Sequence, residues 1–347
     1  MIWIATLLLT FTLSLGCTAL IRRYAVSSEL LDHPNERSSH SLPTPRGGGL
    51  AIVIAFALAS IACWRSGLLS ATSLLASLAG GLAVAGIGWL DDRRALPVRS
   101  RLAVHTIAVM AAIAVLAPIP QITLDLPASL PTPVIFVGIS IVAIWLLNLF
   151  NFMDGIDGIA SVEAITVATS AALILWSGGR PDLAVWPLVL AAAVAGFLYW
   201  NWPPAKIFMG DVSSGFLGFV LGVMAIDTSR VTAISIWSWV ILLGIFFTDA
   251  TVTLLRRMLR GNVWYRAHRC HAYQHLAISW GHARVTISVA LVNLVWLLPL
   301  AWLASRYPAA GGYVALAAYL PLVIVTIRSG AGLEINAIST STPRERV

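Results

Sequence analysis

The segment Asn148-Leu149-Phe150-Asn151-Phe152-Met153-Asp154-Gly155-Ile156-Asp157-Gly158 lies between two apolar runs, at 132–150 and 159–176, each long enough to cross a bilayer. Asn148 and Asn151 are three residues apart and share one face of a helix. Each Asp-Gly step favours a tight turn in which the backbone can approach a ligand closely. A helix that simply ends in a turn would explain the glycines. Two amides and two carboxylates without a basic neighbour instead indicate a polar functional segment at the end of a membrane helix.

Apolar runs of spanning length fill most of the remaining chain. Of its 347 residues, 59% are hydrophobic and 11% are charged, which excludes an ordinary soluble enzyme. Eleven such runs are present, at 2–21, 49–64, 71–90, 102–118, 132–150, 159–176, 183–200, 212–228, 232–250, 285–304 and 311–327. We therefore expect an all-α, polytopic membrane bundle of about 10–11 transmembrane helices. Residues 1–328 would form a single catalytic domain, and residues 329–347 a polar, flexible tail.

Basic residues are distributed unequally between the two sides of the expected bundle. The chain has 22 Lys and Arg residues, and Lys206 is the only lysine. Four of them, Arg65, Arg180, Arg230 and Arg306, fall on one side, and the others fall on the opposite side. The positive-inside rule places the second set in the cytoplasm, and with it the tail and the loops near 22–48, 91–101, 148–158, 201–212 and 251–284. Such a distribution is typical of topology control, and it argues against a nucleic-acid partner.

Five aspartates collect at the expected cytoplasmic ends of these spans: Asp91, Asp92, Asp154, Asp157 and Asp211. A carboxylate beside a low-dielectric layer is costly unless it is hydrated, paired or bound to a metal ion, so each is a candidate functional group. The adjacent pair Asp91-Asp92 would repel unless it shared a cation or a proton, and Mg²⁺ prefers oxygen ligands of this kind. The alternatives are a charged stop paired with nearby arginines for Asp91-Asp92, and a helix cap for Asp211.

The last expected cytoplasmic loop carries His268-Arg269-Cys270-His271-Ala272-Tyr273-Gln274-His275 after several arginines. This setting indicates a cationic collar for a diphosphate or a lipid phosphate. A zinc site built from its His and Cys side chains and an interfacial structural loop are the alternatives. Asp249, shortly before it, would partner a helix dipole or an arginine, or contribute to the site. Phe208, close to Asp211, would be ordinary packing or would stack on the base of a nucleotide.

Taken together, these motifs resemble the polyprenyl-phosphate N-acetylhexosamine-1-phosphate transferase family, glycosyltransferase family 4, which includes WecA and MraY. The resemblance runs from the segment Pro43-Thr44-Pro45-Arg46-Gly47-Gly48-Gly49 to His275. It implies transfer of an N-acetylhexosamine 1-phosphate from a UDP-sugar to undecaprenyl phosphate with release of UMP, the initiating step of O-antigen or related surface glycan synthesis. It also implies a Mg²⁺ cofactor, with Mn²⁺ as an alternative, and an active site on the cytoplasmic face of the bacterial inner membrane.

Site roles follow from the resemblance position by position. We assign catalytic roles to Asp91, Asp92, Asp154, Asp157 and Asp211, with Asp157 and Asp211 as metal ligands. We assign substrate binding to Thr44, Arg46, Gly48, Asn148, Asn151, Lys206, Phe208, His268, Arg269, His271 and His275. Ala95 replaces a third acid of some relatives, and the His segment lacks the consecutive histidines of the peptidoglycan enzymes, so the resemblance is closer to WecA-type members. Membrane lipids and a second copy of the chain are further expected partners. An ion- or proton-coupled transporter is the alternative function, and it would carry its acids near mid-span.

Overall fold

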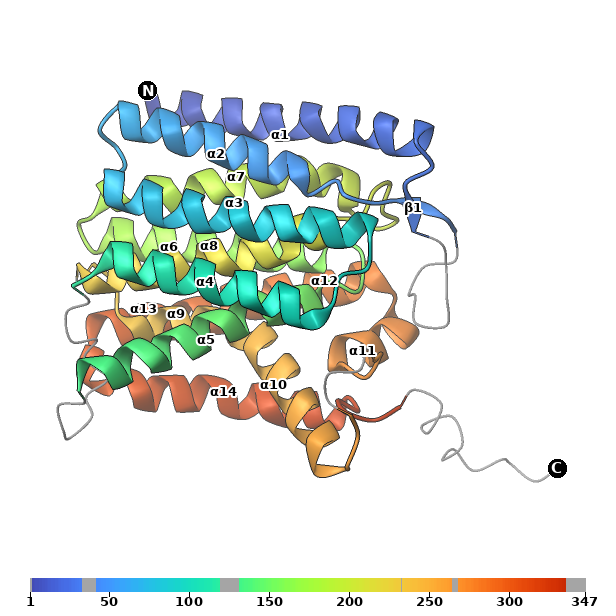
Figure 1. The fold of residues 1–347 in the computed structure, drawn as a ribbon. Helices are drawn as coiled ribbons and strands as arrows, with labels where there is room; N and C mark the ends of the chain where they lie inside the picture. The colour runs from blue at the N-terminus through green and yellow to red at the C-terminus, as the bar shows by residue number, and fades with distance from the viewer. Residues whose placement is uncertain (1, 33–41, 119–130, 232, 264–267, 335–347) are drawn as a thin grey trace.

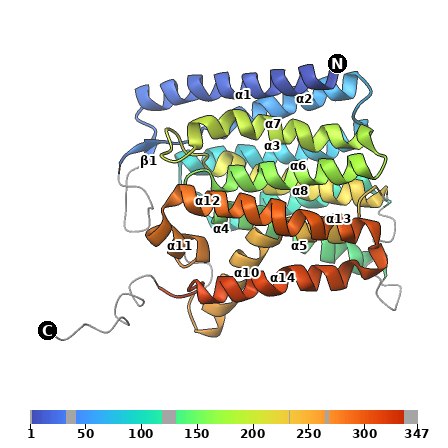
Figure 2. The same ribbon diagram turned by 180° about the vertical axis from the view of Figure 1, so that it is seen from behind.

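The computed structural model describes residues 2–32, 42–118, 131–231, 233–263 and 268–334. It is a bundle of long helices that lie side by side, from α1 at one edge to α14 at the other, as seen from the front in Figure 1 and from behind in Figure 2. The long helices are α1 (Ile2–Ser27), α2 (Leu50–Arg65), α3 (Ala71–Arg93), α4 (Val98–Leu116), α5 (Thr132–Met153), α6 (Ile159–Ser177), α7 (Pro181–Asn201), α8 (Asp211–Arg230), α10 (Gly244–Leu259) and α14 (Gly311–Arg328). The shorter elements are α9 (Ile236–Leu242), α11 (Ala272–Trp280), α12 (His282–Leu291), the π-helix η1 (Val292–Leu297), α13 (Leu298–Arg306) and the 3₁₀ turn η2 (Pro308–Ala310).

The expected membrane bundle is confirmed. Within the described residues, nine helices are long and apolar enough to cross a membrane, and a bent pair of helices adds a tenth candidate. The remaining expected run, at 49–64, forms α2, which is apolar but has 16 residues and is therefore short for a full span.

The run expected at 232–250 is not one straight span, which corrects the sequence prediction. It forms α9 and α10, whose axes differ by 70°. The break lies at Leu243, whose ψ of 7° departs from the helical value. Beyond it, α10 continues to Leu259 and carries arginines beside exposed apolar side chains. Because this part of α10 is amphipathic, a search for continuous apolar runs ends at residue 250, before the helix does.

A second irregular span contains η1 between α12 and α13. Pro299 has no backbone N–H, so one bond of the regular helical ladder cannot form where the π-helix ends. At this π-helix, Asn293 donates hydrogen bonds to Glu163 Oε2 and to Thr166 Oγ1, both at 2.7 Å. Glu163 lies about one turn after the start of α6 and not at mid-span, where a transporter would be expected to carry its acids. It is fully buried and is bonded across two helices.

The centre of the bundle is α8. Of its most apolar stretch, 94% is buried inside the protein, and it packs on both α3 and α5. Small residues allow this packing, because a Cβ on Gly218 would lie 2.6 Å from the Leu146 carbonyl oxygen of α5. The start of α8 is therefore held between the ends of its neighbours, and this places Asp211 at a junction of several segments.

The tail is partly ordered, contrary to the expectation of a flexible segment at 329–347. Ala331 is fully buried, and the Gly332 N–H donates to the Cys270 carbonyl at 2.7 Å. The Leu333 carbonyl lies 3.1 Å from His275 Nε2. The start of the tail thus packs on the His segment, and residues 335–347 lie outside the described part of the chain.

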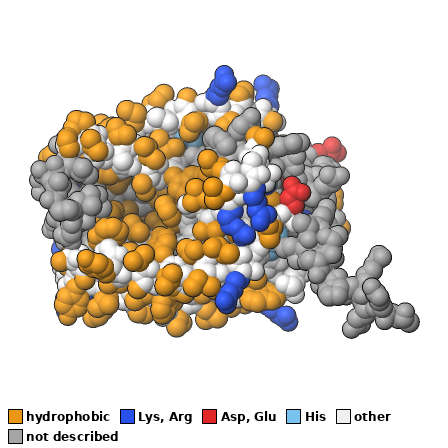
Figure 3. Space-filling model, turned by 90° about the horizontal axis from the view of Figure 1, so that it is seen from below, with side chains coloured by type: hydrophobic (Ala, Val, Ile, Leu, Met, Phe, Trp, Pro, Cys, Tyr) orange, Lys and Arg blue, Asp and Glu red, His pale blue; other side chains and the backbone are white. Residues whose placement is uncertain are grey.

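The outer surface suits a lipid environment. Apolar side chains cover most of the described part of the face in Figure 3, and basic side chains gather toward one end of it. On α14, Tyr313, Leu316 and Leu320 are 80%, 69% and 60% exposed. Contiguous exposed apolar side chains of this kind are expected where a protein meets lipid tails.

Candidate active site

Asp92 accepts hydrogen bonds from the first residues of α8. Its Oδ1 accepts a hydrogen bond from the backbone N–H of Asp211 at 2.9 Å, and its Oδ2 accepts one from Val212 at 3.1 Å. These N–H groups have no partner inside their own helix. Gly210 has a φ of 77°, and a Cβ at this position would lie 2.5 Å from Asp92 Oδ2. Arg46 Nε completes the contacts of Asp92 at 2.9 Å. Asp92 therefore caps α8 from α3, a role that the sequence had suggested for Asp211.

The Asp211 carboxylate joins four segments of the chain. Its Oδ1 accepts a hydrogen bond from Asn151 Nδ2 at 2.9 Å, and Arg46 Nη2 lies 3.4 Å from the same oxygen. Arg101 Nη1 lies 3.4 Å from its Oδ2 and 2.6 Å from Asp91 Oδ2. Sequence reasoning did not single out Arg101, whose only signal was its place in a basic loop. We call Asp91, Asp92, Asp154 and Asp211 the acid cluster.

Asp154 is the member of the acid cluster that has no hydrogen-bond or ion-pair partner among the described residues. It directly follows the end of α5. Burial raises the pKa of Asp154 well above its usual range, and the neighbouring Asp211 charge raises it further against the opposing effect of Arg46. A carboxylate in this position gains from a cation. Asn148, by contrast, bonds within α5, because its Nδ2 donates to the Ile144 carbonyl at 2.7 Å.

Asp157 lies in a separate set of contacts. Its Oδ2 accepts a hydrogen bond from the Ala205 N–H at 3.1 Å and lies 3.2 Å from His282 Nδ1. Its carbonyl accepts a hydrogen bond from the Thr286 hydroxyl at 3.0 Å. Within the described residues, no direct contact joins Asp157 to Asp211, the other expected metal ligand. His282 begins α12 and was missed, because a single histidine after a glycine carries no recognisable motif.

The glycine-rich segment pairs with the loop before α8. The Gly48 N–H donates to the Phe208 carbonyl and the Gly49 N–H to the Met209 carbonyl, both at 2.9 Å. A Cβ on Gly49 would lie 1.8 Å from Ser213 Oγ, so the two backbones can approach this closely only with glycine there. Gly48 and Phe208 therefore contribute through their backbones to the position of Arg46 and Asp211.

Two expected substrate-binding residues make contacts elsewhere. Thr44 belongs to the short strand β2 (Thr44–Pro45), which pairs with β1 (Leu31–Asp32), and its hydroxyl donates to the Leu42 carbonyl at 3.0 Å. Lys206 Nζ lies 5.2 Å from the centre of the Tyr199 ring and 5.5 Å from that of Trp200. Neither side chain makes a contact with the acid cluster.

Asp249 organises the His segment from α10. It accepts hydrogen bonds from the backbone N–H groups of Ala272 at 2.9 Å and Tyr273 at 3.0 Å, and lies 3.3 Å from His271 Nδ1. Asp249 is thus a long-range cap of α11. The Tyr273 hydroxyl donates to the Phe152 carbonyl at 3.0 Å, which places the His segment against the end of α5 that leads into the acid cluster.

Several nitrogen atoms in and beside this His segment have no hydrogen-bond partner in the described part of the chain. Arg257 Nε, Arg269 Nε and His268 Nδ1 are buried and have no hydrogen-bond partner within the described residues. Burial, together with the neighbouring His271 and Arg257, lowers the pKa of His268 to about 4. His268 is therefore neutral at pH 7, and the positive charge of the expected collar belongs to Arg257 and Arg269. His275 bonds to the tail instead.

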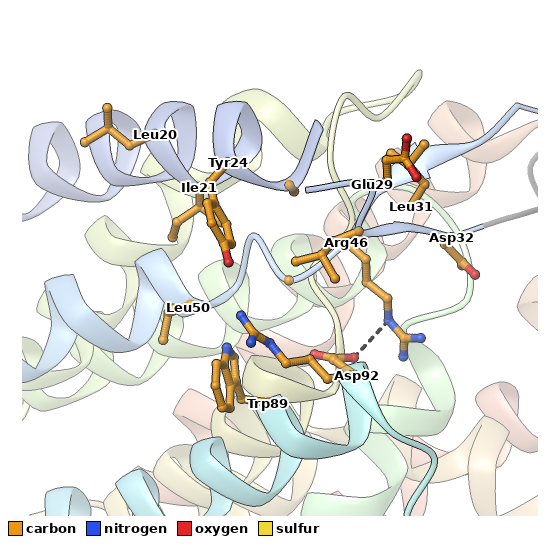
Figure 4. A pocket seen from close by; sticks show the side chains of 14 residues that line it. Leu20, Ile21, Tyr24, Glu29, Leu31, Asp32, Arg46, Leu50, Trp89 and Asp92 are labelled. Carbon is orange, nitrogen blue, oxygen red and sulfur yellow. Dashed lines mark ion pairs between the residues drawn. The ribbon is translucent and has the colours of Figure 1, made fainter. Parts of the chain in front are cut away.

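A cavity of about 500 Å³ opens beside the acid cluster, between the ends of α1, α2 and α3 (Figure 4). Its apolar wall includes Leu20, Ile21, Tyr24, Leu50 and Trp89. At its polar end Arg46 pairs with Asp92, and the Arg93 guanidinium lies 3.9 Å from the centre of the Trp89 ring. The cavity thus offers an apolar wall and a charged end, a combination that suits an amphiphilic phosphate.

The family model described as Glycosyl transferase family 4 matches residues 74–229, which include the whole acid cluster. Over this stretch the chain is similar to that family. It is 28% identical to a probable undecaprenyl-phosphate N-acetylglucosaminyl 1-phosphate transferase of Bacillus subtilis, over 80% of this chain and 78% of that protein. It is also 28% identical to a decaprenyl-phosphate N-acetylglucosaminephosphotransferase of Mycobacterium tuberculosis, over 79% and 76% of the two chains. A third relative, an undecaprenyl-phosphate alpha-N-acetylglucosaminyl 1-phosphate transferase of Salmonella typhi, is 26% identical over 76% and 72%.

The acid cluster has oxygen ligands of the kind that Mg²⁺ prefers. Among the described residues, no three His, Cys, Asp or Glu side chains are grouped closely enough to hold an ion by themselves. Mg²⁺ usually takes only one or two carboxylates and completes its shell with water and phosphate oxygens. The unpartnered Asp154 carboxylate and its neighbour Asp211 supply such a pair. The donor set therefore fits Mg²⁺ better than zinc, which favours a closed set of His and Cys ligands.

Proposed function

We propose that this chain transfers an N-acetylhexosamine 1-phosphate from a UDP-sugar to undecaprenyl or another polyprenyl phosphate. An oxygen of the lipid phosphate forms a bond to the sugar-linked phosphorus, the bond between the two phosphates of UDP breaks, and UMP leaves with the electron pair. The printed functions of the relatives support this reaction. The observation that carries it is the contact of Asp211 with Arg46, Arg101 and Asn151 from three other segments.

The acid cluster is the proposed reaction centre. Phosphoryl transfer mainly requires positioning and neutralisation of charge, so a divalent ion and fixed cations are the expected tools. Asp211 and Asp154 would hold Mg²⁺, which supplies neutralisation of the diphosphate when it is bound. Both oxygens of Asp92 already accept backbone hydrogen bonds, so Asp92 holds the frame of the site. Asp91 and its partner Arg101 are left to orient the lipid phosphate.

The two substrates would approach from different sides. The acceptor carries a long apolar chain and a phosphate, and the cavity beside Arg46 and Arg93 has a matching apolar wall and charged end. The donor is soluble and carries a diphosphate. The unpartnered nitrogens of Arg257 and Arg269 suit that group, because arginine recognises phosphate oxygens through paired hydrogen bonds. The Tyr273 hydroxyl donates to the Phe152 carbonyl, two residues before Asp154, so this part of the chain lies close to the acid cluster.

The proposed location is the bacterial inner membrane, with the acid cluster on its cytoplasmic face. The unequal distribution of arginines supports this orientation. The donor, as a nucleotide sugar, is a cytoplasmic compound, which requires the same orientation. The step would initiate an O-antigen or a related surface glycan, and the departure of the His segment from the peptidoglycan pattern supports a WecA-type donor.

The experiment is an assay of UMP release by the detergent-purified protein. It contains Mg²⁺, undecaprenyl phosphate and, in turn, each of several UDP-N-acetylhexosamines, with controls that lack lipid or Mg²⁺. Release that requires lipid, Mg²⁺ and one particular sugar is the expected result. Asp211→Asn should abolish release in protein that remains folded. Release without lipid, or full activity of Asp211→Asn, would overturn the proposal.

A further inference from the structure

Two cations share one tryptophan ring at the end of α1 and α7, apart from the acid cluster. The Arg22 guanidinium lies 5.8 Å from the centre of the Trp200 ring, and Lys206 Nζ lies 5.5 Å from it. Arg22 Nε also donates to the Lys206 carbonyl at 3.2 Å, and Trp200 Nε1 donates to the Leu15 carbonyl at 3.1 Å. The ring, the arginine and the loop that carries Lys206 are thus fixed to one another. Figures 1 and 2 show α1 and α7 side by side.

These cations have no acidic partner within the described residues, and neither has Arg23 beside them. The stacked arginines Arg65, Arg93 and Arg306 differ, because each lies as a single cation over a tryptophan, at 6.0, 3.9 and 5.7 Å. Two like charges held against the same ring repel each other, and cation–π contact offsets only part of that repulsion. An anion between Arg22 and Lys206 would offset the rest.

The position of Arg22 and Lys206 indicates which anion would bind between them. Leu20 is 64% exposed one turn before Tyr24, Tyr199 is 60% exposed, and Trp202 is 40% exposed. Exposed apolar and aromatic side chains next to cations are typical of the level at which lipid headgroups lie. Arg46 and Arg101 form ion pairs with carboxylates of the acid cluster. Within the described residues, no carboxylate pairs with Arg22 or Lys206.

We propose that Arg22 and Lys206 form a binding site for the phosphodiester of an anionic phospholipid, with Tyr199 and Trp200 as its aromatic wall. Arginine would bind the phosphate oxygens through its paired N–H groups, and the lysine would act as a point charge. The bound lipid would tie α1 to the loop at 201–210, which leads directly to Asp211. Under this proposal Lys206 binds a phospholipid and not the UDP-sugar or the acceptor, as the sequence analysis had expected.

The test measures phospholipid retention by the full-length protein. Wild type and variants are reconstituted in bilayers of equal parts phosphatidylglycerol and phosphatidylcholine, extracted into detergent, and examined by native mass spectrometry for bound phosphatidylglycerol. The variants are R22Q/K206Q and a matched control, R65Q/R306Q, which also removes two stacked cations. Each interfacial cation contributes about fivefold to attraction for anionic lipid, so R22Q/K206Q should weaken retention about thirtyfold. The control should retain the lipid as wild type does.

A charge-conserving variant, R22K/K206R, separates loss of the site from loss of folding, and it should retain the lipid. If R22Q/K206Q cannot be purified folded, K206Q alone should show the fivefold loss, because the Lys206 side chain is exposed. Unchanged retention by these variants, or an equal loss in the control, would overturn the proposal. Displacement of the lipid by inorganic phosphate would overturn the lipid assignment in favour of a soluble phosphate.

Discussion

Removal of the Asp92 carboxylate should cost stability as well as turnover. Asp92→Ala deletes the cap of α8 at Asp211 and Val212, a loss of about 1 kcal/mol. It also deletes the 2.9 Å contact with Arg46, and a hydrogen bond between charged groups contributes about 2 kcal/mol. We expect a loss of about 3 kcal/mol, which corresponds to a fall of about 6 °C in Tm at roughly 2 °C per kcal/mol for a chain of this size.

The measurement is thermal unfolding in detergent, followed by circular dichroism at the helix band, together with UMP release. Asp211→Asn provides the contrast, because it removes a charge from among other acids and should lose turnover with little change in Tm. Asp182→Ala is the control: its pair with Arg180 is exposed at another end of the bundle, so Tm should stay unchanged. An Asp92→Ala protein with wild-type Tm and no turnover would refute the structural role of Asp92.

Three further predictions follow from the site. Because burial raises the pKa of Asp154 and that of Asp211, Mg²⁺ competes with protons at both proposed ligands, so Mg²⁺ binding should strengthen as pH rises and Asp154→Asn should weaken that pH dependence; an identical pH dependence in the variant would contradict it. Gly49→Ala should lower Tm, since its Cβ would meet Ser213 Oγ at 1.8 Å, whereas Gly16→Ala, with open space around it, should not. Asp249→Asn should weaken the cap of α11 and raise the KM for the UDP-sugar more than that for the lipid; an equal rise in both KM values would count against a donor-side role.

Most of the long helices were predictable because they leave a long apolar run in the sequence. The approximate place of the site was also predictable, because carboxylates at the ends of separate spans have few positions available other than one end of the bundle. Arg46, Asn151 and Asp211 do meet there. That part of the reasoning needed only composition, spacing and the dielectric cost of a buried charge.

The individual partners were not predictable from sequence. Asp92 caps a helix that begins 119 residues later, and Asp157 pairs with His282 across 125 residues. Neither separation leaves a local pattern. Lys206 was assigned to substrate binding from its place in a motif. Its contacts with Tyr199 and Trp200, and its position near Arg22, depend on the packing of α1 on α7 and leave no signal in the sequence. The bend between α9 and α10 was missed because both helices are apolar there and form one run in the sequence. The end of α10 was missed because its last turns are amphipathic.

The order of synthesis has a consequence for the last part of the site to form. Ala331, Gly332 and Leu333 pack on the His segment, and a ribosome delivers them only after α14. While α14 is being inserted, these residues are still inside the exit tunnel. The His segment therefore lacks its contacts with residues 331–333 until these residues have left the tunnel, whereas the acid cluster, complete by Asp211, can assemble earlier. A nascent chain would thus carry its reaction centre before the loop proposed to hold the donor has settled.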